Sequence, residues 1–228
     1  MPRLDRDGEV FVLNLGDAEN RFNADSVAAI NVLLDEVEAV PRPRALVTTA
    51  TGKTWSLGLD LDWIGAHPDD VVPFLASVQG LLDRVLVSPM PTVAALRGHT
   101  FAGGAMLALA HDFRVMRADR GYFCLPEVDI NLAFTDGMSA LIQSKLAHRV
   151  AHESMTTGRR YGGTDAAAEG IVDAAVPEAE VLSAAIERAR PLASKDGPTL
   201  GAIKQRMYTR AHRLLLDPHP LGVEALIS

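Results

Sequence analysis

Short β-prone runs alternate with amphipathic helical segments along much of the chain, and this order limits the fold more than any other feature. Residues 10–15, 45–49 and 92–96 are apolar runs of strand length bounded by glycine or proline. Residues 27–37 and 71–87 carry apolar side chains at helical spacing. A short helix is also expected at residues 105–110, and further strands at residues 113–116, 122–125 and 171–176. The repeated order of strand, strand and helix predicts an α/β fold with short strands.

The last part of the chain is mainly helical, from about Asp136 onward. No shift in composition and no low-complexity segment marks a linker before it. We therefore expect a core domain at residues 1–195 and a C-terminal helical tail at residues 196–228. The tail carries apolar side chains such as Ile203 and Met207, which predict that it packs on a partner chain or folds back on its own core.

Charge and hydropathy exclude several classes of partner. The formal net charge of −7 disfavours nucleic acid, because phosphate neutralisation needs a cationic surface. Apolar runs are shorter than the roughly 18 residues of a membrane span, and the charged residues 1–7 are not a signal peptide. The single cysteine, Cys124, fits a reducing compartment, and residues 224–228 carry no peroxisomal tripeptide. The sequence predicts a cytoplasmic protein without membrane contact.

Three local features are candidates for chemistry. Gly103 and Gly104 precede an apolar helix, whose N-terminal N–H groups stabilise negative charge, although a tight turn has the same pattern. Residues 51–61 form a loop of glycine, hydroxyl and apolar residues after a buried strand. Glu127 follows a strand and Pro126, so it is either a general base in apolar surroundings or an exposed turn carboxylate.

The ordered series of these motifs resembles the enoyl-CoA hydratase/isomerase family, also called the crotonase family. The likeness extends from about residue 9 to the 190s and is carried by residues 89–99 (PMPTVAALRGH), Gly103-Gly104, His111-Asp112, and residues 123–130 (FCLPEVDI), 158–160 and 166–172. It implies a crotonase-type spiral of repeated ββα units with a C-terminal helical region. It also implies a core domain that binds an acyl-CoA thioester, no cofactor beyond the CoA of the substrate, and a homotrimer or hexamer.

The resemblance also assigns residues of the site. Family members hold the thioester carbonyl between two backbone N–H groups, which align with those of Leu59 and Gly103. Such donors stabilise an enolate by about 3–4 kcal/mol each. Glu127 aligns with a catalytic glutamate of the family. Further substrate contacts are implied for Ser56, Leu57, Gly58, Asp60 and Gly104, and no metal is implied.

One departure from the family pattern indicates the reaction. Hydratases of the family carry a second glutamate in the helix after the glycines, where this sequence has Met106. A thioether neither takes a proton at neutral pH nor orients water well. Because one carboxylate suffices for a 1,3-proton shift, the resemblance implies an enoyl-CoA isomerase that moves a 3-enoyl-CoA double bond to the 2-position in fatty acid β-oxidation. The chain resembles most the plant-type Δ3,Δ2-enoyl-CoA isomerases, through residues 89–92, 98–99, 116–121 and 127–130.

Other functions remain open on the sequence. Asp136 lies near the point where dienoyl-CoA isomerases carry an aspartate, but ahead of Gly137 it is equally a helix N-cap. A hydratase-like homologue with other acyl-CoA chemistry is a second alternative. A catalytically silent acyl-CoA-binding protein is a third, favoured by the loss of a carboxylate at Met106 and disfavoured by the presence of Glu127.

Three histidines and the cysteine have more than one interpretation. His148 and His152 stand four residues apart on a predicted helix, a spacing that binds metal, but no third ligand is evident and surface histidines are commoner. His99 lies in the predicted loop before the glycine pair, where it either lines the site or is hydrogen-bonded in a structural role. Cys124 adjoins the glutamate turn and is expected to be a buried, inert thiol.

An anionic CoA substrate needs a local basic patch, because the chain as a whole is negative. Arg21 and Lys53 lie near segments that bind the cofactor's nucleotide in the family. Exposed basic side chains need no such role, so both interpretations remain for these two residues.

Overall fold

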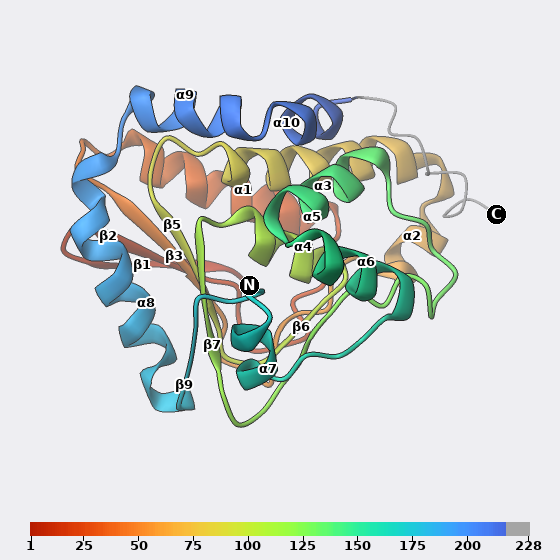
Figure 1. Cartoon of the computed structure of the whole chain (residues 1–228). Coiled ribbons are helices and arrows are strands. Elements are labelled where there is room, and N and C mark those ends of the chain that lie inside the picture. Colours follow the sequence, from red (N-terminus) through yellow and green to blue (C-terminus); the bar gives the residue numbers. More distant parts are fainter. Residues whose placement is uncertain (218–228) are drawn as a thin grey trace.

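A six-stranded sheet forms the centre of the chain in the computed structural model, which describes residues 1–217 (Figure 1). Its strands are, in order, β1 (Arg3–Asp7), β2 (Val10–Asn14), β3 (Ala45–Thr49), β5 (Thr92–Leu96), β7 (Phe113–Arg117) and β9 (Ala174–Val176). β1 pairs antiparallel with β2, and the other neighbours pair in parallel. The predicted α/β class is confirmed. Residues 218–228, the end of the predicted tail, lie outside the described residues.

The inner strands β2, β3 and β5 are buried on both faces, which explains why they are continuous apolar runs in the sequence. On β2, Val10 and Val12 pack in a cluster that α8 (Val181–Ala189) completes, whereas Phe11 and Leu13 belong to the larger core on the other face. The helices of the larger core are α1 (Ala24–Ala39), α3 (Val71–Leu86), α4 (Gly103–Ala110) and α5 (Asp136–Lys145). The sheet is therefore the middle of three layers (Figure 1).

Polar side chains begin two of these helices. Asn23 caps α1, because its Oδ1 accepts the Ser26 N–H at 2.9 Å and Ser26 Oγ accepts the Asn23 N–H in return. Thr135 caps α5, since its Oγ1 accepts the Met138 N–H at 3.2 Å. The interpretation of Asp136 as this cap is therefore wrong by one residue. Asp136 is instead the exposed first residue of the helix.

A second, smaller sheet positions the loops that matter for function. β4 (Thr54–Ser56), β6 (His99–Phe101) and β8 (Phe123–Cys124) pair in parallel, and each follows a strand of the large sheet and precedes a helix. This arrangement is the predicted ββα repeat. β4 and β6 approach closely at Gly98, where a Cβ would lie only 2.2 Å from the Lys53 carbonyl oxygen. The loops that leave the carboxyl ends of these parallel strands converge, as ligand-binding loops commonly do.

Helices complete the C-terminal part of the described chain, as predicted. They are α6 (His148–Thr157), α7 (Gly163–Ala168), α9 (Pro198–Met207) and α10 (Thr209–Leu215), with 3-10 turns at Glu178–Glu180 and Arg190–Lys195. A further 3-10 turn at Pro68–Asp70 precedes α3. α10 packs on α3 and α5, so this part of the tail folds back on the core (Figure 1). Ile203 and Met207 of α9 are exposed. Within residues 1–217, no helix is long and apolar enough to cross a membrane.

Short elements account for the differences from the sequence prediction. β1, β4, β6 and the short helix α2 (Leu61–Ala66) were not predicted, and His99 therefore lies on a strand rather than in a loop. The predicted strand at residues 171–176 pairs with β7 only from Ala174 onward. The N–H groups of Ile171 and Val172 instead donate to the Ala166 carbonyl oxygen after the end of α7. These two residues are therefore not available to pair with β7.

Candidate active site

An apolar cavity of about 240 Å³ lies where the loops after β4, β6 and β8 converge. We call it the acyl cavity, after the acyl-CoA ligand that the sequence resemblance implies. Its lining consists of Arg21, Leu57, Leu59, Leu61, Leu75, Phe101, Ala102, Gly103, Met106, Pro126, Glu127, Ile130, Leu132, Ala133, Phe134, Thr135 and Met138. Among these described residues only two carry a formal charge, Arg21 and Glu127. A concave apolar site with few polar groups is typical of a pocket for a small ligand.

The predicted pair of N–H donors, Leu59 and Gly103, lies in this lining. A Cβ on Gly103 would be 3.6 Å from the Leu59 nitrogen, so the two loops touch. Phe22 fixes the loop that contains Leu59. Its N–H donates to the Gly58 carbonyl at 2.7 Å, and its carbonyl accepts the Asp60 N–H at 2.9 Å. In such a bridge the N–H of the residue between, Leu59, points to the opposite side.

Neither donor of the pair has a partner in the described part of the chain, because among residues 1–217 the N–H groups of Leu59 and Gly103 make no hydrogen bond. Gly103 is the first residue of α4, where N–H groups lack helical partners and the helix dipole favours negative charge. Ala102 before it has φ +51°, a conformation that costs about 1–3 kcal/mol for a residue with a Cβ. Such strain at a cavity wall indicates a functional constraint on where the Gly103 N–H points.

Glu127 is the one carboxyl group in the described lining of the acyl cavity. It follows β8 in a turn closed by the N–H groups of Asp129 and Ile130, which both donate to the Pro126 carbonyl. The side chain is only 6% exposed, and its Oε2 has no hydrogen-bond partner among the described residues. Burial raises the pKa of this carboxyl from 4.5 to about 7. A carboxyl group with such a pKa both accepts and returns a proton near neutral pH.

No second carboxylate joins Glu127 in the described lining of the acyl cavity. Met106, the position where family hydratases carry a glutamate, is buried in the lining one turn after Gly103. Asp136 is exposed at the start of α5 and is not part of the lining, although Thr135 and Met138 beside it are. The described lining therefore contains one carboxyl side chain together with the pair of N–H donors.

The other predicted contact residues divide into lining and supporting positions. Leu57 lines the acyl cavity, whereas Ser56, Gly58, Asp60 and Gly104 do not. Ser56 Oγ accepts the Gly58 N–H at 3.1 Å and donates to the Asn20 carbonyl, which shapes the loop. Gly104 lies so close behind it that a Cβ would be 2.6 Å from the Ser56 carbonyl oxygen. Direct contact of these four residues with substrate stays a prediction.

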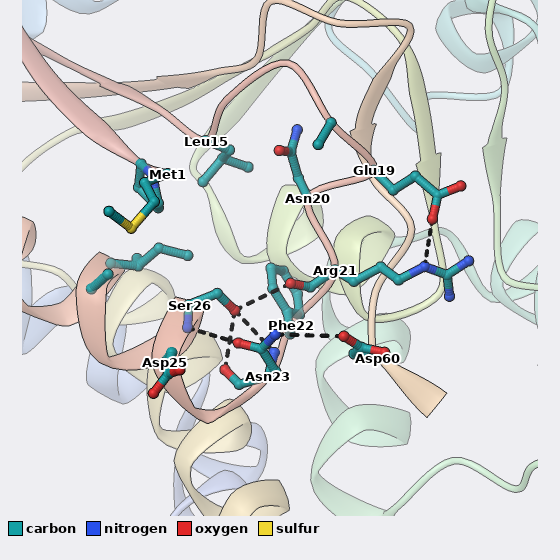
Figure 2. A pocket seen from close by; sticks show the side chains of 14 residues that line it. Met1, Leu15, Glu19, Asn20, Arg21, Phe22, Asn23, Asp25, Ser26 and Asp60 are labelled. Atoms are coloured by element: carbon teal, nitrogen blue, oxygen red, sulfur yellow. Dashed lines mark hydrogen bonds and ion pairs between the residues drawn. The ribbon is translucent and has the colours of Figure 1, made fainter. Parts of the chain in front are cut away.

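A second cavity of about 470 Å³ adjoins the first, between the N-terminus, the loop before α1 and the start of that helix (Figure 2). Arg21 lines both cavities and pairs with Glu19 at 2.7 Å, and Asp60 also contributes to the second lining. Lys53 is exposed and lines neither cavity. Of the two predicted basic contacts, the structure thus brings only Arg21 to the site.

The histidines and the cysteine lie outside the acyl cavity. His99 is not a lining residue, its Nδ1 has no hydrogen-bond partner among residues 1–217, and its ring packs against Phe101. Burial raises the pKa of the Cys124 thiol to about 11, consistent with the expected inert thiol. His148 and His152 are exposed on α6, and the described chain contains no group of three metal-ligating side chains.

Sequence reasoning missed most of the cavity's apolar wall. Leu75 of α3, Phe101 of β6, and Thr135 and Met138 of α5 come from elements far apart in the chain. Helical spacing marked Leu75 as a core position, but no local signal distinguishes a residue that lines a cavity from one that fills the core.

Known proteins match the chain over nearly its whole length. A model of the family described as enoyl-CoA hydratase/isomerase matches residues 6–218. Enoyl-CoA delta isomerase 2, peroxisomal, of Arabidopsis thaliana is 37% identical over 91% of this chain and 92% of its own length. Enoyl-CoA delta isomerase 3 of the same plant is 34% identical over 94% and 95%. The predicted resemblance to plant isomerases is confirmed.

Solved structures agree on the fold. The crystal structure of human mitochondrial delta3-delta2-enoyl-CoA isomerase superposes with a TM-score of 0.88, covering 99% of this chain and 90% of the human chain at 24% identity. A probable enoyl-CoA hydratase of Mycobacterium tuberculosis has the same TM-score at 24% identity. The predicted crotonase-type architecture is thereby confirmed. With a family model that matches almost all of its residues, the chain belongs to the enoyl-CoA hydratase/isomerase family.

Proposed function

We propose that this protein is an enoyl-CoA isomerase that moves the double bond of a 3-enoyl-CoA to the 2-position, with Glu127 as its acid/base. The observation that carries the proposal is a lone buried carboxyl with a pKa near 7 in an apolar cavity that also presents two unused N–H donors. Two plant relatives named enoyl-CoA delta isomerases support it. Incubating the protein with a 3-enoyl-CoA and following the ultraviolet absorbance of the conjugated product tests it.

The proposed reaction needs one base and one anion-stabilising pair. The Glu127 carboxylate removes a proton from C2. The electron pair of that C–H bond moves into the thioester and forms an enolate, whose negatively charged oxygen lies between the Leu59 and Gly103 N–H groups. Each donor contributes about 3–4 kcal/mol of stabilisation. The dienolate then takes the same proton from the Glu127 carboxylic acid at C4, which leaves the double bond between C2 and C3 and restores the carboxylate.

The CoA part of the substrate would leave the acyl cavity past Arg21. This guanidinium lies at the boundary of the two cavities, and its Glu19 partner is largely exposed, so a phosphate competes with a solvated ion pair. A net charge of −7 makes such a local cation necessary for a polyanionic ligand. Assembly as a trimer or hexamer and a cytoplasmic location stay predictions, and one plant relative is named peroxisomal.

The pH dependence follows from the pKa of Glu127. The base must be ionised, and its pKa in the folded protein is raised to about 7. We therefore expect kcat/KM for isomerisation to rise about tenfold per pH unit below 7 and to level off above it. Steady-state kinetics from pH 5 to 9 measure this profile, in which an acid limb near the ordinary glutamate value would contradict the assignment.

Water addition is expected to be slow, because Met106 leaves a water molecule without a second carboxylate. Hydration of 2-enoyl-CoA should run at least about 100-fold slower than isomerisation of 3-enoyl-CoA. Met106→Glu should raise hydration, whereas Met106→Gln is the matched control that adds polarity but no base. Loss of the conjugated absorbance measures hydration, and wild-type hydration faster than isomerisation would refute the single-carboxylate mechanism.

A further inference from the structure

The acyl cavity has a mouth and a closed end, and exposure distinguishes them. Leu61 and Ile130 of the lining are 41% and 44% exposed, so they border the entrance. Leu75 of α3 and Met138 of α5 are 0% and 5% exposed, so they lie in its buried part, as Met106 and Thr135 at 2% each also do. Because Met106 is one turn from the Gly103 donor, we take the α3–α5 wall that carries Leu75 and Met138 as the closed end, which an acyl chain meets last.

Contacts among α3, α5 and α10 support the closed end, so this wall should not move outward easily. Thr135, at the start of α5, donates from its Oγ1 to Gln79 Oε1 of α3 at 2.7 Å. Gly137 fits so tightly that a Cβ would lie 2.7 Å from the same Gln79 oxygen and 2.9 Å from the Leu214 carbonyl of α10. Because α10 packs on both α3 and α5, the wall that carries Leu75 and Met138 has a second layer behind it.

The volume of the acyl cavity sets the length of chain it admits. An apolar protein cavity of about 150 Å³ takes up benzene, which has six carbon atoms. In proportion, the acyl cavity of about 240 Å³ holds about ten non-hydrogen atoms. In the proposed reaction the thioester carbonyl lies beside Leu59 and Gly103, so the rest of this space takes the acyl chain.

We propose that the protein selects medium-chain acyl groups of about eight to ten carbons, and that Leu75 and Met138 set this limit. The inference rests on the proposed function for the double-bond shift but not for binding, because a saturated acyl-CoA fills the same space. Each methylene buried in the cavity strengthens binding about fourfold, and methylenes beyond the closed end add nothing.

Calorimetric binding of saturated acyl-CoAs with 6 to 16 carbons tests the limit directly. Affinity should rise about fourfold per methylene and stop rising at about ten carbons. Met138→Ala removes three non-hydrogen atoms from the closed end and should move the break by two to three carbons. Leu75→Ala is a second variant with the same expected direction. An affinity that climbs steadily to 16 carbons, or breaks that stay in place in both variants, would overturn the inference.

Met90→Ala is the matched control for loss of a buried methionine. Met90 is 1% exposed and lies outside the acyl cavity, so its removal should leave the break at the wild-type length. Isomerase assays with 3-enoyl-CoAs of the same lengths separate the two proposals. If affinity stops rising at about ten carbons but no 3-enoyl-CoA is isomerised, the length limit is supported and the proposed function is rejected. If 3-enoyl-CoAs of all lengths are isomerised equally well, the proposed function is supported and the length limit is rejected.

Discussion

Glu127→Gln is expected to lower kcat for 3-enoyl-CoA isomerisation by about 10²–10⁴-fold, the usual contribution of a general acid/base. Glutamine keeps the shape of the side chain but has no basic oxygen. Dissociation constants of a saturated acyl-CoA should change little, because backbone N–H groups hold the carbonyl. Exchange of the C2 proton with solvent, followed by NMR, should also stop, since enolate formation itself is blocked.

Asp136→Asn is the control for this variant. Asp136 is exposed in the first turn of α5, outside the described lining, so its loss should leave kcat close to the wild-type value. Near wild-type isomerisation in Glu127→Gln together with inactivity of Asp136→Asn would refute the assignment of the base. That result would favour the dienoyl-type chemistry left open by the sequence.

Gly58→Ala is expected to reduce kcat by about 10²–10³-fold, as removal of one oxyanion-hole donor does. Gly58 has φ +82°, and a Cβ there would lie 2.5 Å from the Gly103 nitrogen and 2.9 Å from the Ala102 Cβ. The loop must move to relieve this overlap, so the Leu59 and Gly103 N–H groups no longer converge. Steady-state kinetics with a 3-enoyl-CoA measure the loss.

Gly170→Ala separates this effect from the backbone penalty alone. Gly170 has φ +71°, but a Cβ there would meet nothing within 4 Å. Both variants should lose about 1–2 kcal/mol of unfolding free energy from the left-handed conformation, measured by urea unfolding. Only Gly58→Ala should lower kcat, because only this variant separates the Leu59 and Gly103 N–H groups. Equal kcat values for the two variants would contradict the role of the contact between Gly58 and Gly103.

Buried strands were predictable from the sequence, and strands made by pairing were not. Ala45–Thr49 and Thr92–Leu96 are apolar on both faces and bounded by proline and glycine, so a local window suffices to find them. β1 is charged and largely exposed, and it is a strand only because it pairs with β2. β4 and β6 have three residues each and are likewise defined by their neighbours.

For the site, the residues alone indicated possibilities and the family resemblance selected among them. Glu127 after Pro126 was compatible with a surface turn until its burial and raised pKa were seen. The donor pair of Leu59 and Gly103 cannot be found from side-chain chemistry, because the proposed binding groups are backbone N–H groups. Leu75 and Met138 reach the acyl cavity through tertiary packing, which no single window of sequence contains.

The proposed use of main-chain donors at Leu59 and Gly103 has an evolutionary consequence. Substitution of a side chain does not remove a peptide N–H, so mutations at position 59 and in much of the cavity wall leave the proposed reaction in place. Substitutions at Leu75 and Met138, on α3 and α5, alter the space for the acyl group instead. A lineage descended from this chain thus has a route to new substrates that does not pass through an inactive ancestor.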